Sequence, residues 1–551
     1  MDRHRRPHRR AADPGHRPGT PRAGRRTALH RSGTDRARPG GAPVTTAPAP
    51  TPAAPPPAAR AAGITLAGQA LRIAIQFGSI VLLARLLLPE DYGLLAIVLV
   101  VVGVGEMVRD LGISTAAVQA GSLPPAVRDA LFWTTTAIGC ALCGLLVAAS
   151  GLLSALFDRP QLTGIACALS VVFVLNGLAT MPRVTLTRRM RFGALVGADV
   201  TGQATGALVA VAAAWWGAGY WSLVAQQLTQ GVVVLIVVAG RAGWLPGRPR
   251  WAAGTGPVLR LGGHLLGTQL VSYASNNVDA VTIGLRFDPS ALGLYNRGFQ
   301  LLMTPLNQVR SPATTVALPV LSRLRDEPER FDEYLRRAQL ALGLTVVTGL
   351  AIVAGAAGPL VDLLLGPTWS EVAPILALLA IAGAAQTLAF VGFWVYLSRG
   401  LGAELFRFTL VTSSLRVVCV LGGSHWGVVG VAAGYALAAC LEWPVSLWWL
   451  SRVTAFPGRS LCLGALRILA CAVPAGGASL VVASTAAALP TVLATAASLL
   501  AGVAALALAP LLSRTVRADL SGVLAFGRAM LRRTAAPTPP STPSGREALS
   551  S

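Results

Sequence analysis

Polar and charged side chains recur at helical spacing inside stretches of sequence that are otherwise apolar. Gln69, Arg72 and Gln76 follow one another at intervals of three and four residues, which places them on one face of a helix. Charged groups inside a bilayer are costly, so they normally face protein or a wet cavity. The forked guanidinium of arginine suits phosphate, most of all where the surrounding dielectric is low. These residues therefore fit the binding of an anion along a polar path through a membrane.

Two later apolar segments, at 261–285 and 292–318, carry similar polar stripes. Interhelical hydrogen bonding is the alternative use of such residues. A stripe running the length of a helix would need many partners in a dry interface, and this favours a water-lined path. The residues predicted to bind substrate in this cavity are Gln69, Arg72, Gln76, Arg109, Ser272, Arg297, Gln300, Asn307 and Arg310.

Acidic side chains within the apolar segments are candidates for coupling transport to an ion gradient. Asp279 is the leading candidate, because it lies on the stripe of segment 261–285 with Asn276 near it. Glu106 and Asp110 are weaker candidates, since Arg109 is expected to neutralise one of them. The predicted ion-coupling residues are Asp279, Asn276, Glu106 and Asp110.

Composition places all these residues in a polytopic membrane protein. Of the 551 residues, 53% are hydrophobic and 13% are charged, whereas an average soluble protein is about 25% charged. Apolar runs of about 20 residues, the length of a bilayer-spanning helix, recur from Ile64 to Leu512. Cys140 and Cys143 have the spacing of half a zinc site, but no second pair accompanies them, so no metal site is predicted.

The sequence predicts an all-α fold of about fourteen transmembrane helices. Pro305 and Pro312 are candidates for kinks, and the segment from Arg323 to Arg337 is expected to form an amphipathic cytoplasmic helix. The predicted transmembrane helices are 64–87, 93–113, 129–150, 162–181, 194–214, 219–240, 261–285, 292–318, 340–365, 372–397, 404–421, 427–450, 464–486 and 490–512.

Arginines sort the loops between these helices into two sets. The richer set is cytoplasmic by the positive-inside rule, and both chain termini are then cytoplasmic as well. This orientation puts Arg72, Arg109 and Arg310 in the cytoplasmic halves of their helices, where they would form a cationic cup if they face one cavity. Arg85 and Arg286 fall at external helix ends and are expected to reach lipid headgroups.

The two halves of the chain echo each other. The pattern PEDYGL at 89–94 ends one apolar run and starts the next, and PSALGL does the same at 289–294. A polytopic chain with repeated halves is typical of a two-lobed transporter with its substrate path between the lobes. The predicted domains are a disordered Arg/Pro-rich cytoplasmic tail at 1–62, an N-terminal six-helix lobe at 63–242, a C-terminal six-helix lobe at 243–452, two additional transmembrane helices at 453–513 and a disordered cytoplasmic tail at 514–551.

The chain resembles the polysaccharide transporter branch of the multidrug/oligosaccharidyl-lipid/polysaccharide exporter superfamily, and in it the Wzx-type flippases and the colanic and teichuronic acid exporters. The resemblance covers roughly residues 64 to 450. The segments that carry it are LLARLLLPEDYG at 82–93, DLG at 110–112, VDAVTIG at 278–284, GLYNR at 293–297 and LPVLSRL at 318–324.

This resemblance implies two six-helix bundles facing a central cavity, two trailing helices, and alternating access driven by a proton or sodium gradient. The implied cargo is an undecaprenyl-diphosphate-linked oligosaccharide, flipped across the cytoplasmic membrane for the synthesis of lipopolysaccharide, exopolysaccharide or capsule. We expect a monomeric transport unit among membrane lipids, with no cofactor and no nucleic-acid partner. A polysaccharide polymerase or glycosyltransferase is a candidate protein partner.

Other functions remain open at this point. A multidrug exporter and a lipid II exporter belong to the same superfamily. A membrane polymerase or glycosyltransferase is less favoured, because such enzymes need catalytic loops of substantial length and the external loops here are short. Moreover, Glu90 and Asp91 align with Ser290 and Ala291 in the repeat, as expected of a turn. The sequence therefore predicts a transporter rather than an enzyme.

Overall fold

The computed structural model describes residues 58–249, 255–256, 273–454, 456–512, 516–519 and 522. The chain divides into the units Met1–Pro55 and Pro56–Ser551, and all the described residues belong to the second. Every regular element among the described residues is a helix, and ten stretches of them are long and apolar enough to cross a membrane. The predicted all-α polytopic membrane fold is confirmed, whereas the count of fourteen spans stays a prediction.

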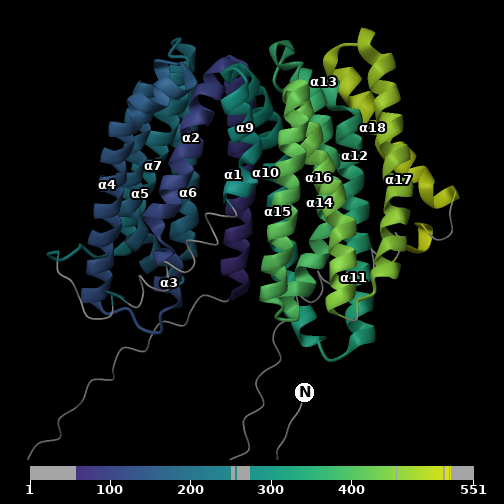
Figure 1. Ribbon diagram of the computed structural model, residues 1–551, viewed down its shortest axis with the longest axis horizontal. Coiled ribbons are helices and arrows are strands. Elements are labelled where there is room, and N and C mark those ends of the chain that lie inside the picture. Colours follow the sequence, from purple (N-terminus) through teal and green to yellow (C-terminus); the bar gives the residue numbers. More distant parts are fainter. Residues whose placement is uncertain are drawn as a thin grey trace, which may run out of the picture. The chain divides into compact units, whose positions relative to one another are not determined.

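Helices of the first half pack mainly against their neighbours in sequence. Helix α4 lies along α5, α6 lies along α7, and α1 packs on α6 (Figure 1). Helix α1 already begins at Ala58, and the rest of the predicted tail at 1–62 lies outside the described residues. The helices are α1 (Ala58–Ala84), α2 (Pro89–Asp110), α3 (Ile113–Gln119), α4 (Pro125–Phe157), α5 (Gln161–Arg188), α6 (Phe192–Trp215) and α7 (Tyr220–Ala242).

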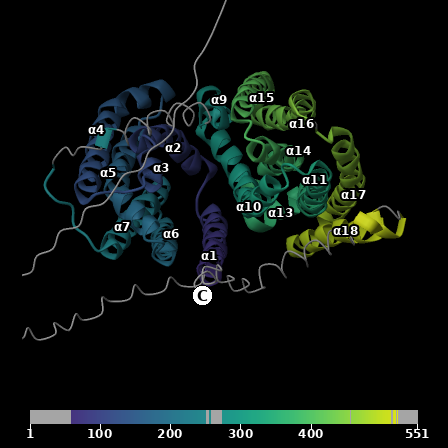
Figure 2. The same ribbon diagram turned by 90° about the horizontal axis from the view of Figure 1, so that it is seen from below.

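The second half packs in the same manner. Helix α14 lies between α10 and α16, and α15 packs on α16 (Figure 2). Helix α17 packs on both α12 and α18. The helices are α9 (Val278–Arg286), α10 (Pro289–Arg323), α11 (Pro328–Leu342), α12 (Thr348–Gly355), α13 (Ala357–Leu364), α14 (Val372–Ser398), α15 (Gly402–Gly423), α16 (Gly427–Val453), α17 (Gly458–Thr485) and α18 (Thr491–Leu512).

The repeated sequence pattern forms the start of a helix in each half. Pro89 and Pro289 occupy the first turns of α2 and α10, where a missing N–H group costs no intrahelical hydrogen bond. In the first half, the carboxylate of Asp91 accepts a hydrogen bond from the backbone N–H of Leu88 at 3.0 Å. The two copies thus fix equivalent helix starts in both halves.

Most of the segment at 323–337 forms an amphipathic helix, α11, as predicted, whereas its cytoplasmic position stays a prediction. Helix α11 continues through a π-helical turn, Gly343–Val347, directly into α12. Its apolar face buries Phe331 and Leu335 in a cluster with Leu321 of α10 and Trp394 of α14. Because this face packs against the neighbouring helices, the amphipathic segment extends a membrane helix instead of standing apart from it.

The predicted helix 340–365 is interrupted in the structure. Helix α12 ends at Gly355 and α13 begins at Ala357, with Ala356 at φ −89° and ψ 8°. Pro359 has no N–H group to donate to the carbonyl of Gly355. Because α13 begins at Ala357, Pro359 lies in its first turn, where a missing N–H group costs no intrahelical hydrogen bond.

The largest apolar cluster joins the two halves of the chain. It includes Tyr92 of α2, Leu292 and Tyr295 of α10, and Trp369 after α13, all of them buried. Helices α2 and α10 pack directly against each other along this seam. The seam therefore positions the polar residues that lie on both sides of it.

Candidate functional site

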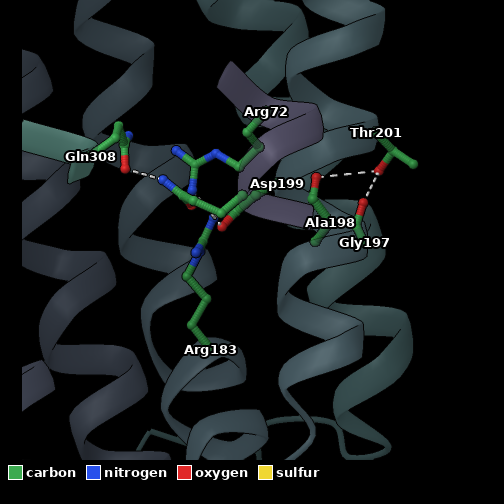
Figure 3. A network of polar contacts seen from close by, with 8 residues as sticks. Arg72, Arg183, Gly197, Ala198, Asp199, Thr201 and Gln308 are labelled. Carbon is green, nitrogen blue, oxygen red and sulfur yellow. Dashed lines mark hydrogen bonds and ion pairs between the residues drawn. The ribbon is translucent and has the colours of Figure 1, made fainter. Parts of the chain in front are cut away.

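A carboxylate held between two arginines lies in the first half, where α1, α5 and α6 meet (Figure 3). Arg183 contacts Asp199 at 2.6 Å, and the predicted site residue Arg72 contacts the other oxygen of Asp199 at 3.5 Å. The arginine side chains are 39% and 40% exposed, and that of Asp199 is 24% exposed. Two positive charges around one negative charge leave the cluster with one excess positive charge.

The unequal distances give the two arginines different roles. The short pair fixes Asp199 against α5, whereas Arg72 is held loosely and keeps much of its guanidinium accessible. Arg183 and Asp199 were not predicted as site residues. The sequence signal that could have indicated this cluster was Asp199, an acidic residue within the predicted transmembrane helix 194–214.

We expect Arg183→Gln to lower stability more than Arg72→Gln, because only Arg183 makes a short ion pair with Asp199. Partly exposed pairs contribute roughly 0.2–1 kcal/mol, so a double-mutant cycle with Asp199→Asn should give a coupling in that range for Arg183 and near zero for Arg72. Thermal unfolding in detergent measures both couplings. Equal couplings would show that the two arginines hold the carboxylate alike.

One hydrogen bond beside this cluster links the two halves. The side-chain amide of Gln69 on α1 donates to that of Gln308 on α10 (Figure 3). Farther along α1, Gln76 is half-buried, and Ser79 accepts a hydrogen bond from Gln226 of α7 at 3.2 Å. The stripe on α1 thus contacts the second half at one point and the first half at another.

The charged side chains at the end of α2 have contacts within the first half. The Nε of Arg109 donates to Glu106 at 2.9 Å, and its Nη1 donates to Thr180 of α5 at 2.7 Å. Asp110 accepts a hydrogen bond from Ser114. The neutralisation predicted for one of the two acids therefore falls on Glu106.

A cavity of about 600 Å³, lined by both aromatic and polar side chains, lies in the second half of the chain. It is lined from α10, α14, α15 and α16 and from residues just before α9. The lining includes the predicted site residues Asn276, Asn307 and Arg310. Its volume falls in the range of about 300–1,000 Å³ that is usual for ligand sites.

Arg310 reaches across this cavity from α10 to α14. Its Nη2 donates to the carbonyl of Gly383 and the hydroxyl of Thr387, both at 2.9 Å, and its Nη1 donates to Gln386 at 3.3 Å. The residue is only 8% exposed. None of these partners is acidic, so its positive charge is unneutralised by direct contact.

A second arginine in the cavity was missed by the prediction. Arg416 of α15 donates to Asn276 at 2.8 Å and pairs with Glu442 of α16 at 3.4 Å. Arg416 and Glu442 carry opposite charges and lie on consecutive predicted helices, 404–421 and 427–450. That complementarity was the signal for this pair.

Asp279 lies deeper in the same half. It is 3% exposed and accepts a hydrogen bond from the hydroxyl of Tyr295 at 2.5 Å. Asn276, the neighbouring candidate, contacts Arg416 instead. The two proposed coupling residues are therefore connected to different partners.

Two further predicted residues of α10 lie away from this network, and one lies outside the description. The guanidinium of Arg297 stacks on the ring of Tyr92, 3.6 Å from its centroid, and is buried in the seam between the halves. Gln300 donates to Asn296 at 3.4 Å. Ser272 lies outside the residues that the structure describes.

The predicted cationic cup is therefore spread over separate surroundings. Arg72 belongs to the Asp199 cluster, Arg109 to the α2–α5 contact, and Arg310 to the cavity of the second half. The substrate and coupling roles of these residues stay predictions.

The repeated glycines of the two halves meet each other at the seam. A Cβ added to Gly93 would lie 1.7 Å from the carbonyl oxygen of Pro289, and one added to Gly293 would lie 1.9 Å from that of Pro89. Real Cβ atoms essentially never approach so closely. We call these four residues the glycine contact; it lets the backbones of α2 and α10 touch.

Two side chains near the glycine contact, Trp369 and Arg85, add hydrogen bonds between the halves. The indole N–H of Trp369 donates to the carbonyl of Ala84 at 2.7 Å, and its ring packs edge-on against Tyr92. Arg85 donates to the carbonyl of Leu363 at 2.6 Å, and Arg286 donates to Ser424 at 2.5 Å. These two arginines, expected at lipid headgroups, thus have partners within the protein.

Comparison with known proteins places this arrangement in a family. The family described as polysaccharide biosynthesis protein matches residues 82–374, more than half of the chain. The lipopolysaccharide biosynthesis protein WzxC of Escherichia coli is 21% identical over 65% of this chain and 74% of its own. The succinoglycan biosynthesis transport protein ExoT of Rhizobium meliloti is 26% identical over 67% and 74%.

Solved structures share the fold at lower identity. The lipid II flippase MurJ in an inward closed conformation matches with a TM-score of 0.63 at 13% identity, over 82% of this chain and 98% of its own. An inward-facing multidrug resistance transporter of the MATE family matches with a TM-score of 0.53 at 14% identity, over 70% and 98%. The chain belongs to the polysaccharide biosynthesis protein family and has the fold of the multidrug/oligosaccharidyl-lipid/polysaccharide exporter superfamily.

Proposed function

We propose that this protein is a flippase that moves an undecaprenyl-diphosphate-linked oligosaccharide across the cytoplasmic membrane for surface polysaccharide synthesis. The observation that carries the proposal is the glycine contact, in which equivalent segments of two repeated halves close against each other in a member of this family. Relatives named for lipopolysaccharide biosynthesis and succinoglycan transport support a polysaccharide cargo. The protein moves its cargo and catalyses no bond formation in this proposal.

Alternating access supplies the mechanism. The glycine contact blocks passage at one end of the α2–α10 pair, and Gln308 lies 15 residues beyond Gly293 on α10, or about 22 Å at 1.5 Å per residue. Cargo leaves at the blocked end only when α2 and α10 part. In one state of the cycle the glycine contact is broken, and in the other state the Gln69–Gln308 hydrogen bond is broken.

The accessible guanidinium of Arg72 receives the diphosphate in this mechanism. A diphosphate offers the oxygen atoms that an arginine fork prefers, and the excess positive charge of the Asp199 cluster attracts it. The lipid tail stays in the bilayer throughout. Because Arg183 retains Asp199, the cluster keeps its structure as cargo binds and leaves.

The remaining features of the proposal concern energy and orientation. A proton or sodium gradient drives the cycle through Asp279, and no cofactor takes part. Both termini are cytoplasmic, and the glycine contact faces outward, as the arginine-rich loops favour. A monomer suffices for transport, with a polymerase or glycosyltransferase acting on the same cargo.

The test is the pool of lipid-linked intermediates in a deletion strain. Extracted diphosphate-linked glycans are released and identified by mass spectrometry. We expect one undecaprenyl-linked oligosaccharide to accumulate while surface polysaccharide disappears, and the intact gene to restore both. Accumulation of a peptidoglycan precursor, or an unchanged pool with increased drug sensitivity, would contradict the proposal in favour of a lipid II or drug exporter.

A further inference from the structure

Six aromatic side chains among the described residues line the cavity of the second half. Two of its rings, Phe299 and Tyr435, meet edge to face with centroids 6.1 Å apart. Phe390 and Phe393 stack at 5.9 Å, and Tyr396 stacks on Phe408 at 5.6 Å. These pairs come from α10, α14, α15 and α16, so the rings line the cavity on several sides.

Hydrogen-bonding groups alternate with these rings. The paired Arg416 and Glu442 present both a donor and an acceptor, with side chains 14% and 21% exposed. The amide of Gln386 accepts from Arg310 and donates to the hydroxyl of Tyr435 at 3.1 Å. The lining therefore combines flat apolar faces with oriented polar groups.

Some polar atoms of the residues that line the cavity make no hydrogen bond. Within the described part of the chain, the Nε of Arg310 and the hydroxyl of Tyr396 are buried and have no hydrogen-bond partner. Among the described residues, the charged ones that line the cavity are Arg310, Arg416 and Glu442, which together carry one excess positive charge. The net positive charge of the lining favours a ligand that carries negative charge.

We propose that this cavity binds an acidic sugar residue of the cargo, with its carboxylate at Arg310 and its ring against the aromatic side chains. The inference rests on the proposed function and names a second binding region besides Arg72. Sugar rings have apolar C–H faces that pack on aromatic rings, and hydroxyl groups that both donate and accept hydrogen bonds. The Arg416–Glu442 pair satisfies those hydroxyls.

Other occupants fit this lining less well. A diphosphate would use the arginines but has no apolar face for the six rings. A lipid tail would pack on the rings, but it carries no negative charge to balance Arg310, and a buried charge without compensation is costly. Only a ligand with apolar faces, hydroxyl groups and a negative charge uses every part of the lining.

Binding can be measured without transport. The full-length protein in lipid nanodiscs is titrated with methyl β-glucuronide, methyl β-glucoside and inorganic pyrophosphate, and saturation-transfer NMR reports contact with the ring protons of each sugar. Arg310→Gln removes the charge, and Phe393→Leu removes an aromatic face while keeping apolar volume. Arg407→Gln is the matched control, because Arg407 lies on α15 with a side chain 68% exposed and pairs with Glu404 away from the cavity.

We expect the glucuronide to bind at least tenfold more tightly than the glucoside. Arg310→Gln should weaken this binding at least tenfold, Phe393→Leu should weaken saturation transfer to the sugar ring, and Arg407→Gln should leave both unchanged. Thermal unfolding of each variant verifies that it is folded.

Three results would overturn the inference: no saturable sugar binding, equal affinity for both sugars, or displacement of the glucuronide by equimolar pyrophosphate. Glucuronide binding that neither cavity variant alters would overturn it as well. The proposed function is tested separately by the intermediate pool of the deletion strain. If a lipid-linked oligosaccharide accumulates there while the purified protein binds no sugar, only the cavity assignment fails.

Discussion

Gly93→Leu is expected to reduce transport at least tenfold while the protein still inserts in the membrane. A side chain at this position meets backbone atoms of Pro289, which cannot rotate away as a flexible side chain does. Overpacking of this kind costs about 1–3 kcal/mol, which lowers the equilibrium constant for forming the closed state roughly 5–150-fold. Flipping of the lipid-linked oligosaccharide in reconstituted vesicles measures the loss.

The effect should be the same from the other half of the chain. Gly293→Leu meets the carbonyl of Pro89 and should reduce transport to a similar degree. Gly144→Leu on α4 is the matched control, because a Cβ there meets nothing within 4 Å. Normal transport in both seam variants would show that the cycle does not require the glycine contact.

Asp279→Asn is expected to abolish the dependence of transport on an ion gradient. The carboxylate is buried and bonded to Tyr295, and an amide of the same shape neither exchanges a proton nor balances a sodium ion. Vesicles with and without an imposed proton or sodium gradient measure the ratio of the two transport rates. We expect the gradient to raise the rate at least tenfold in the unaltered protein and to leave it unchanged in the variant.

Tyr295→Phe serves as the matched variant for this measurement. It removes the hydrogen bond to Asp279 and leaves the carboxylate in place, so gradient dependence should persist. If Asp279→Asn keeps its gradient dependence, the coupling group lies elsewhere. Glu106, already paired with Arg109, and Asp110 are then the residues to substitute.

The length of the apolar runs predicted the membrane helices well, because burial in lipid demands long apolar segments. The predicted helix 427–450 matches α16 at Gly427–Val453, and 194–214 matches α6 at Phe192–Trp215. The break at Ala356 was not predicted. A single proline in an apolar run leaves the hydropathy signal intact even though it removes a backbone donor.

The grouping of the arginines was harder to predict than their location inside the membrane. Helical spacing shows which residues share a face, but it does not show which neighbouring helix that face meets. Arg310 therefore looked equivalent to Arg72 and Arg109, although it lies in a cavity with Arg416. The partner of each charge depends on helix rotation, which is set by packing along the entire seam.

The glycine contact has the form of a contact between two identical subunits. Each half presents the same proline and the same glycine to the other, so that position 93 meets 289 and position 293 meets 89. Reciprocity of this kind defines an isologous interface, the type that joins symmetric homodimers. A half-length ancestor carrying this segment would have paired with its own copy, and gene duplication followed by fusion would have preserved that interface within one chain.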